Sequence, residues 1–190
     1  MKKIPSLFQR NHDGDRLVRN EVTPEAEWVP AGEGEATRKL DGTCCLVRAG
    51  RLYKRCEVKP GGKAPPDFEP ANDVDEVTGK QQGWVPVGDG PEDRWHREAW
   101  QLFQCIQATG DPAEDDGTYE LLGPKVQGNA EGKDKHKLEP HGCAELPDCP
   151  RDFDGIKAYL AERDIEGVVW HHPDGRMVKI KAKDFGLKRK

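Results

Sequence analysis

Three short polar motifs constrain the fold of this chain most, because each stands beside or within a short apolar run. Lys39–Gly42 (Lys-Leu-Asp-Gly) is followed closely by Cys44–Val47. Glu166 directly precedes Gly167–Trp170, and Lys179–Lys181 alternates polar and apolar residues. Short apolar or alternating runs bounded by turn residues are typical of strands. The three motifs are therefore expected at strand ends or on one strand face.

The remaining sequence predicts further strands in a hairpin-rich arrangement. Residues 36–55 are predicted to form a hairpin, with its turn at Ala49 and Gly50. The other predicted strands are, in chain order, 83–87, 117–122, 167–170 and 177–181, the last two joined by a turn at 173–175. Residues 59–93 are rich in Pro, Gly and Asp, so a long surface loop is expected there.

Two amphipathic helices complete the expected fold. Residues 94–108 carry apolar side chains at helical spacing. Those expected to face the core are Trp95, Ala99, Leu102, Phe103 and Ile106. Asp152 is a good N-cap for a second helix through Arg163. The fold class expected from these elements is α+β, with residues 1–190 forming a single domain.

Charge and hydropathy limit where the protein acts and what it binds. Mean hydropathy is −0.90, and no stretch is long enough to cross a bilayer. The Met1–Pro5 start lacks the apolar segment of a secretory signal, so a cytoplasmic protein is expected. The net charge of −5 argues against binding nucleic acid by bulk electrostatics. Residues 175–190 form a local basic segment, seven Lys/Arg and one acid (7 − 1 = +6), whose alternative role is a solubilising tail.

The six cysteines are expected to be reduced thiols. No two of them form a Cys-x-x-Cys pair, and a cytoplasmic protein keeps thiols reduced. Cys143 and Cys149, with His141 nearby, are the alternative, a zinc site, but their spacing matches no common zinc pattern. Buried or half-buried thiols are favoured over metal ligands at these positions.

The three motifs carry groups that suit phosphate chemistry. A lysine amine such as that of Lys39 is a nucleophile once burial or nearby positive charge lowers its pKa. Lys179 and Lys181 share one strand face, where they can neutralise phosphate charge. Glu166 offers the carboxylate that Mg²⁺ prefers. The alternatives are a surface lysine before a turn, a lysine-bearing edge strand and a solvent-exposed glutamate.

Two more charged residues stand out within predicted strands. Glu120 lies at the centre of the 117–122 run, where an apolar residue would cost less, so it needs a partner or a role. Arg55 ends the first hairpin and can contact a ribose or a phosphate. Its alternative is an exposed arginine at a strand end.

Taken in order, these residues resemble the covalent nucleotidyltransferases, which include ATP-dependent DNA ligases, RNA ligases and mRNA capping guanylyltransferases. The resemblance implies an adenylation domain of antiparallel sheets with flanking helices and a central ATP cleft. It implies that Lys39 takes AMP, that Glu166 holds Mg²⁺ (or Mn²⁺), and that ATP is bound by Arg55, Glu120, Lys179 and Lys181.

Three longer segments, residues 34–45, 117–129 and 174–186, resemble the small RNA ligases shared by phages, bacteria and vertebrates. This resemblance implies a ligase that joins RNA 5′-phosphate and 3′-hydroxyl ends. A phage protein acting in a bacterial cytoplasm fits it, and a monomer is expected. The basic segment, above all Lys183, Lys188, Arg189 and Lys190, is expected to contact RNA.

The chain departs from DNA ligases and capping enzymes after the third motif. Those enzymes continue into an OB-fold, whereas nine residues follow Lys181 here (190 − 181 = 9), so no OB-fold is expected. The alternatives are a DNA nick ligase and a nucleotide- or RNA-binding protein that adenylylates itself without sealing.

Overall fold

The computed structural model describes residues 4–107 and 115–189. The described chain divides into two compact units, one within residues 41–141 and one formed by 4–40 and 142–189. The fold is α+β with antiparallel sheets and few helices, as expected. Whether the two units act as a single domain stays a prediction. In the described residues no helix is long and apolar enough to span a membrane.

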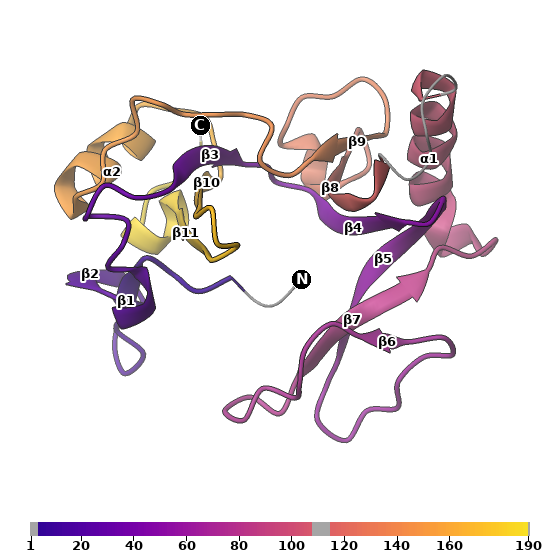
Figure 1. Ribbon diagram of the computed structural model, residues 1–190, viewed down its shortest axis with the longest axis horizontal. Helices are drawn as coiled ribbons and strands as arrows, with labels where there is room; N and C mark the ends of the chain where they lie inside the picture. Colours follow the sequence, from indigo (N-terminus) through magenta and orange to yellow (C-terminus); the bar gives the residue numbers. More distant parts are fainter. Residues whose placement is uncertain (1–3, 108–114, 190) are drawn as a thin grey trace. The chain divides into compact units, whose positions relative to one another are not determined.

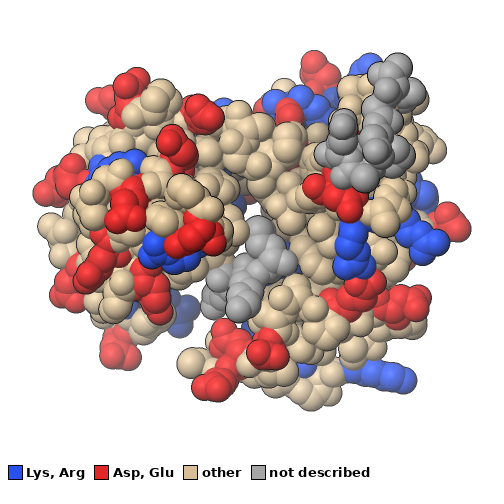
Figure 2. All heavy atoms as spheres, in the orientation of Figure 1, with Lys and Arg blue, Asp and Glu red and all other residues tan. Residues whose placement is uncertain are grey.

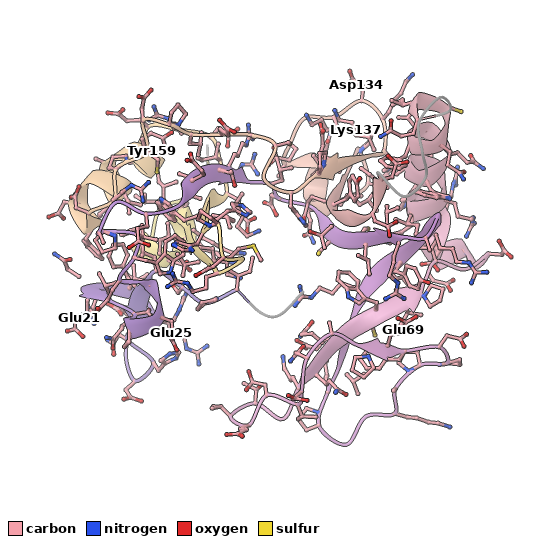
Figure 3. All side chains as sticks on the ribbon, in the orientation of Figure 1. Glu21, Glu25, Glu69, Asp134, Lys137 and Tyr159 are labelled. Carbon is pink, nitrogen blue, oxygen red and sulfur yellow. The ribbon has the colours of Figure 1, made fainter. Side chains whose placement is uncertain are left out.

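A six-stranded antiparallel sheet forms the 41–141 unit, in the order β6-β7-β5-β4-β8-β9 (Figure 1). Its strands are β4 Thr43–Arg48, β5 Arg51–Val58, β6 Glu69–Pro70, β7 Gln81–Pro86, β8 Gly117–Leu122 and β9 Lys137–Pro140. Figure 3 labels Lys137 at the start of β9 and Glu69 at the start of β6. Helix α1 (Arg94–Ile106) contributes Ala99 and Phe103 to one core with Cys45, Val47 and Leu121 of the sheet.

Several predictions for this unit are confirmed, and two are wrong. The strands at 83–87 and 117–122 and the helix from residue 94 are present. The hairpin is formed by β4 and β5 alone, since residues 35–39 pair in another sheet. Ile106 does not face the core, because it lies at the last turn of α1, where its side chain is 70% exposed.

A three-stranded antiparallel sheet lies at the centre of the other unit. Strand β10 (Gly167–His171) is the middle strand, with β3 (Glu35–Lys39) on one side and β11 (Met177–Lys181) on the other. The small ladder of β1 (Phe8–Arg10) and β2 (Val18–Val22) belongs to the same unit. One core contains Phe8, Val168, Trp170 and Ile180, which are all nearly or fully buried.

Helix α2 (Phe153–Ala161) begins as predicted at Asp152, whose carboxylate accepts a hydrogen bond from the Gly155 amide at 2.9 Å. The helix buries Ile156, Tyr159 and Leu160 against the core of this unit. Tyr159 is labelled on α2 in Figure 3. The Arg163 guanidinium lies 3.6 Å from the centre of the Tyr159 ring, so a cation–π contact adds to the packing.

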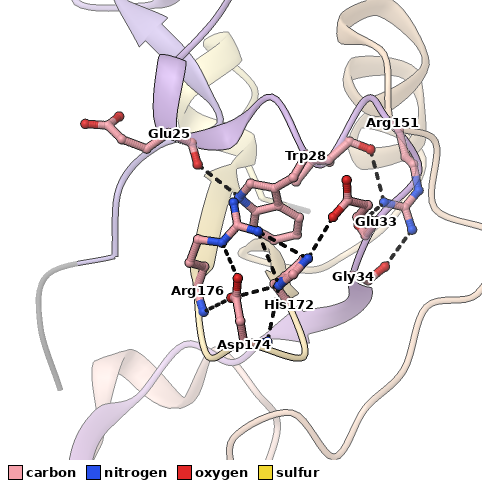
Figure 4. A network of polar contacts seen from close by, with 9 residues as sticks. Glu25, Trp28, Glu33, Gly34, Arg151, His172, Asp174 and Arg176 are labelled. Atoms are coloured by element: carbon pink, nitrogen blue, oxygen red, sulfur yellow. Dashed lines mark hydrogen bonds and ion pairs between the residues drawn. The ribbon is translucent and has the colours of Figure 1, made fainter.

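A polar network fixes the end of this sheet that lies away from Lys39 (Figure 4). His172 lies between Glu33 (Nε2–Oε2, 2.8 Å) and Asp174 (Nδ1–Oδ1, 2.7 Å). Arg151 donates to the carbonyls of Glu33 (2.5 Å) and Gly34 (2.7 Å) just before β3 begins. These contacts fix the entry of β3 and the turn between β10 and β11, so the register of all three strands is held from that end.

Candidate active site

Strand register brings Lys39 and Lys181 to the same level of the three-stranded sheet. Gly167 of β10 is opposite Lys39 of β3 and also opposite Lys181 of β11. Residues directly opposite one another in an antiparallel pair share a face, so both lysines project from the same side. Glu166 directly precedes Gly167 and is therefore carried to the lysines by the middle strand.

Glu166 binds both lysines. Its Oε2 accepts from Lys39 Nζ at 2.6 Å, and its Oε1 accepts from Lys181 Nζ. The three side chains are 13–20% exposed, so they are mostly shielded from solvent. Two cations on one partly buried carboxylate leave the cluster with an excess positive charge, which favours a further anion.

The two lysines determine the protonation of Glu166. Burial raises the pKa of its carboxyl, but the charges and hydrogen bonds of Lys39 and Lys181 outweigh burial and hold that pKa below its ordinary value. The carboxylate is therefore ionised at neutral pH and remains an acceptor for both ammonium groups.

Steric crowding explains why the Glu-Gly motif has glycine at position 167. A Cβ at this position would lie 2.1 Å from the Ile180 carbonyl oxygen and 2.8 Å from the Lys181 Cα. No side chain fits at that distance, so glycine allows β11 to approach and place Lys181 beside Glu166.

The Lys-Ile-Lys strand is arranged as predicted. Ile180 is fully buried in the core, while Lys179 and Lys181 are half-buried on the other face. Lys179 is opposite Val169 of β10. It lies two residues from Lys181 and therefore on the same face as Lys39 and Lys181. This face of the sheet thus carries the lysines of two motifs.

Glu120 and Arg55 lie in the 41–141 unit and form a second group there. Glu120 is 6% exposed, and its partners are the Gly42 amide (Oε1, 3.0 Å) and His141 Nε2 (Oε2, 2.7 Å). Arg55 is half-buried on β5 and donates from Nε to Gln82 Oε1 at 3.1 Å. The expectation that Glu120 has a polar partner is confirmed.

Gly42 lies close to the backbone of β8. A Cβ on Gly42 would lie 2.2 Å from the Leu121 carbonyl oxygen. Glycine therefore allows the chain to approach β8, where the Gly42 amide donates a hydrogen bond to Glu120.

The cysteines are unpaired, and their burial differs from the expectation at Cys143. Cys143 is exposed, since it lies in the 141–150 connection outside any strand, whereas Cys149 is buried as expected. Burial raises the pKa of the Cys149 thiol to about 11. Cys44 lies beside Glu120, and burial followed by the Glu120 charge raises its pKa although Arg55 opposes the shift.

The basic C-terminal segment is partly packed into its unit. Asp184 is 3% exposed and accepts from the Lys181 amide (3.0 Å) and from Arg10 (2.5 Å). Arg189 pairs with Asp164 at 2.8 Å. Lys183 and Lys188 are exposed, and Lys190 lies outside the described residues. On the face shown in Figure 2, acidic and basic side chains are interspersed rather than gathered by sign.

No protein-family model matches the chain. Curated proteins named RNA ligase 1 do match it over nearly its whole length. The mouse protein (Mus musculus) is 26% identical over 98% of this chain and 80% of its own length. The zebrafish protein (Danio rerio) is 27% identical over 98% of this chain and 81% of its own length. This chain is a relative of the RNA ligases.

The comparison confirms the predicted resemblance to RNA ligases. The mouse and zebrafish proteins are vertebrate members, and the likeness to phage and bacterial members stays a prediction. The sequence places His141 near Cys143 and Cys149, whereas the structure brings it to Cys44 and Glu120, because strand pairing joins segments distant in the sequence.

Proposed function

We propose that this protein is an ATP-dependent RNA ligase that works through a lysyl-AMP intermediate on Lys39. The observation that carries the proposal is the convergence of Lys39, Glu166 and Lys181, one residue from each of the three motifs. The relatives named RNA ligase 1 support the class of reaction and the kind of acceptor.

In the first proposed step, Lys39 Nζ attacks the α-phosphorus of ATP. A phosphorus–nitrogen bond forms, the bond to the bridging oxygen breaks, and pyrophosphate leaves with the electron pair. The amine must give up a proton to attack. Glu166 Oε2, 2.6 Å from Nζ, is the nearest group able to accept it.

Lys181 and Lys179 are the proposed partners of the ATP phosphates. Both project from the lysine-bearing face of β11, and an ammonium group there opposes the charge that builds on the phosphates as pyrophosphate departs. In this proposal the incoming phosphates draw Lys181 from Glu166, which leaves that carboxylate to Lys39.

Glu166 is also the proposed residue for Mg²⁺ (or Mn²⁺). Its donor type fits, because Mg²⁺ takes carboxylate oxygens. Each oxygen already accepts from an ammonium group, so a metal there would share the carboxylate with a lysine or replace one. When bound, the ion would neutralise phosphate charge.

Arg55 and Glu120 are the proposed ribose and phosphate contacts. Glu120 is buried and ionisable, and its carboxylate can accept from a ribose hydroxyl. The Arg55 guanidinium has several N–H donors, which suit phosphate oxygens. Both roles follow from the family resemblance and from the polar partners described for the two side chains.

The later proposed steps transfer and release AMP. A 5′-phosphate oxygen of RNA attacks the phosphorus of lysyl-AMP, which breaks the nitrogen bond and returns the Lys39 amine. A 3′-hydroxyl then attacks the RNA 5′-phosphate, and AMP leaves. Lys183, Lys188, Arg189 and Lys190 are the proposed contacts to the RNA backbone.

The experiment that tests the proposal follows covalent AMP. The protein is incubated with α-labelled ATP and Mg²⁺, denatured and examined for an acid-labile label. Lys39→Ala should carry no label, whereas the control Lys157→Ala, an exposed lysine on α2 in the same unit, should label like wild type. Label in the Lys39 variant would overturn the assignment.

Assays with different acceptors then distinguish an RNA ligase from the alternative functions. The proposal expects AMP transfer to 5′-phosphorylated RNA and sealing to a 3′-hydroxyl end. Preferential sealing of nicked DNA would instead indicate a DNA ligase, and stronger labelling by GTP would indicate a capping enzyme. Self-labelling without transfer to any nucleic acid would indicate another acceptor.

A further inference from the structure

Three potential metal ligands converge on one face of the six-stranded sheet. Cys44 Sγ, a carboxylate oxygen of Glu120 and a ring nitrogen of His141 all lie within 4.8 Å of one another. Thiolate, carboxylate and imidazole are the three ligand types that Zn²⁺ accepts. All three residues lie within the 41–141 unit.

Strand register explains why the three side chains meet. Cys44 of β4 is directly opposite Glu120 of β8. His141 follows the end of β9, and its amide donates to the Thr118 carbonyl at 3.1 Å, which continues the β8–β9 ladder by one pair. Thr118 and Glu120 are two residues apart on one strand and so share a face. Three neighbouring chain segments therefore supply one ligand each.

The spacing of the ligand atoms is close to what a tetrahedral metal needs. Bonds of about 2.0–2.3 Å to Zn²⁺ hold neighbouring ligand atoms about 3.3–3.6 Å apart. His141 Nε2 and Glu120 Oε2 are 2.7 Å apart and would open slightly, while the wider pairs would close from at most 4.8 Å. These are adjustments that side-chain rotation provides.

The two ring nitrogens of His141 differ in their contacts. Among the described residues, the buried His141 Nδ1 has no hydrogen-bond partner. Glu120 is nearly fully buried, Cys44 is half-buried and the His141 side chain is 23% exposed, so the ligands are partly withdrawn from water. His141 Nε2, which lies 2.7 Å from Glu120 Oε2, is the candidate ligand, and Nδ1 is the other ring nitrogen.

We propose that Cys44, Glu120 and His141 form a binding site for a borderline-soft divalent cation of the Zn²⁺ type. Three protein ligands leave the fourth position of a tetrahedral metal to water or to another small ligand. The site differs from the proposed Mg²⁺ position at Glu166 in its thiolate and imidazole ligands, which Mg²⁺ disfavours. The site shares Glu120 with the proposed ribose contact, so a metal bound there would compete with that role, and its test uses no ligase activity.

Cobalt is the probe, because Co²⁺ occupies zinc sites and its visible spectrum reports geometry and sulfur ligation. The full chain is reduced, stripped of metal and titrated with Co²⁺. The proposal expects one Co²⁺ per chain, with intense visible bands of tetrahedral coordination and a sulfur-to-cobalt charge-transfer band. Zn²⁺ should remove these bands, and a large excess of Mg²⁺ should leave them.

Variants identify the sulfur. Cys44→Ser should lose the charge-transfer band, and His141→Gln should weaken Co²⁺ binding at least tenfold. Cys143→Ser, which removes the exposed thiol of the alternative zinc site, is the control and should retain the wild-type spectrum. Circular dichroism confirms that each variant is folded.

The proposal is overturned if the wild-type chain shows no charge-transfer band, whatever the variants do. It is also overturned if folded Cys44→Ser keeps the band, or if Cys143→Ser loses it. Neither result bears on the labelling of Lys39, so failure of the metal site and failure of the ligase proposal are distinguishable.

Discussion

Lys39 and Glu166 are 127 residues apart in the sequence, yet Lys39 Nζ and Glu166 Oε2 are 2.6 Å apart. The contact exists because β3 and β10 pair with Lys39 opposite Gly167. One carboxylate thereby holds the proposed nucleophile and, through its other oxygen, the Lys181 ammonium of the third motif.

Glu166→Gln should reduce self-adenylylation strongly while keeping the side-chain size. The amide cannot accept a proton from Lys39 or offset two ammonium charges, so labelling should fall on the order of 10²–10³-fold. The measurement is the initial rate of label incorporation from α-labelled ATP. Glu162→Gln, an exposed glutamate after α2, is the control. Equal rates in wild type and Glu166→Gln would contradict a role for this carboxylate.

Gly167→Ala should destabilise the protein. Its Cβ would lie 2.1 Å from the Ile180 carbonyl, so β11 must move away, at a cost of roughly 1–3 kcal/mol in free energy of unfolding. Gly117→Ala on β8 is the matched control, because the nearest atom to its Cβ is 3.8 Å away. Urea denaturation measures both. A Gly167 variant as stable as the control would show that this close approach is not required.

Stability should depend on pH through His96. Burial lowers the pKa of His96, Asp93 opposes this shift, and Lys54 adds to it. His96 therefore binds a proton more readily in the unfolded chain than in the folded protein. The stability that neutral His96 contributes is fully present above 6.5, the pKa of His96 in the unfolded chain. This stability is lost as the pH falls toward and through the lower pKa of His96 in the folded protein.

His96→Leu should remove this dependence. Among the described residues neither His96 ring nitrogen has a hydrogen-bond partner, so leucine leaves no new polar group unsatisfied. The free energy of unfolding is measured by urea denaturation between pH 7.5 and pH 5, where one proton gives a slope of at most about 1.4 kcal/mol per pH unit. The control is His12→Leu, which replaces an exposed histidine. An unchanged slope in His96→Leu would count against the buried neutral imidazole.

Exposed lysines of the C-terminal segment should act on RNA rather than on ATP. The double variant Lys183→Gln, Lys188→Gln removes two exposed charges and retains Leu187, which packs against the core. Lys39 labelling should be preserved, while AMP transfer to RNA weakens and its log–log salt slope becomes shallower by about 0.7 per lost phosphate contact.

The double variant Lys59→Gln, Lys63→Gln of two exposed residues tests the loop between β5 and β7 as an alternative RNA-binding surface. If that variant changes the salt slope and the Lys183/Lys188 variant does not, the RNA contact lies in the loop and the C-terminal lysines are a solvated end. Lys157→Gln serves both variants as a control for loss of an exposed charge.

The sequence alone predicts the local elements of the fold and the chemical groups that its motifs carry. The β4–β5 and β10–β11 hairpins, helix α2 with its Asp152 cap and the inward-facing Ile180 all follow from interactions between residues close in the chain. Side-chain alternation and capping are short-range effects, so they can be read without knowing the partners of a strand.

The pairing of distant strands is seen only in the tertiary structure. Nothing near residue 39 indicates that β3 leaves the first hairpin to join β10, or that Glu166 would accept from two lysines. Likewise, Cys44 and His141 meet at Glu120 only through the β4–β8 and β8–β9 registers. Pairing between distant strands depends on burying one common core, which no local pattern specifies, and both candidate sites are products of that pairing.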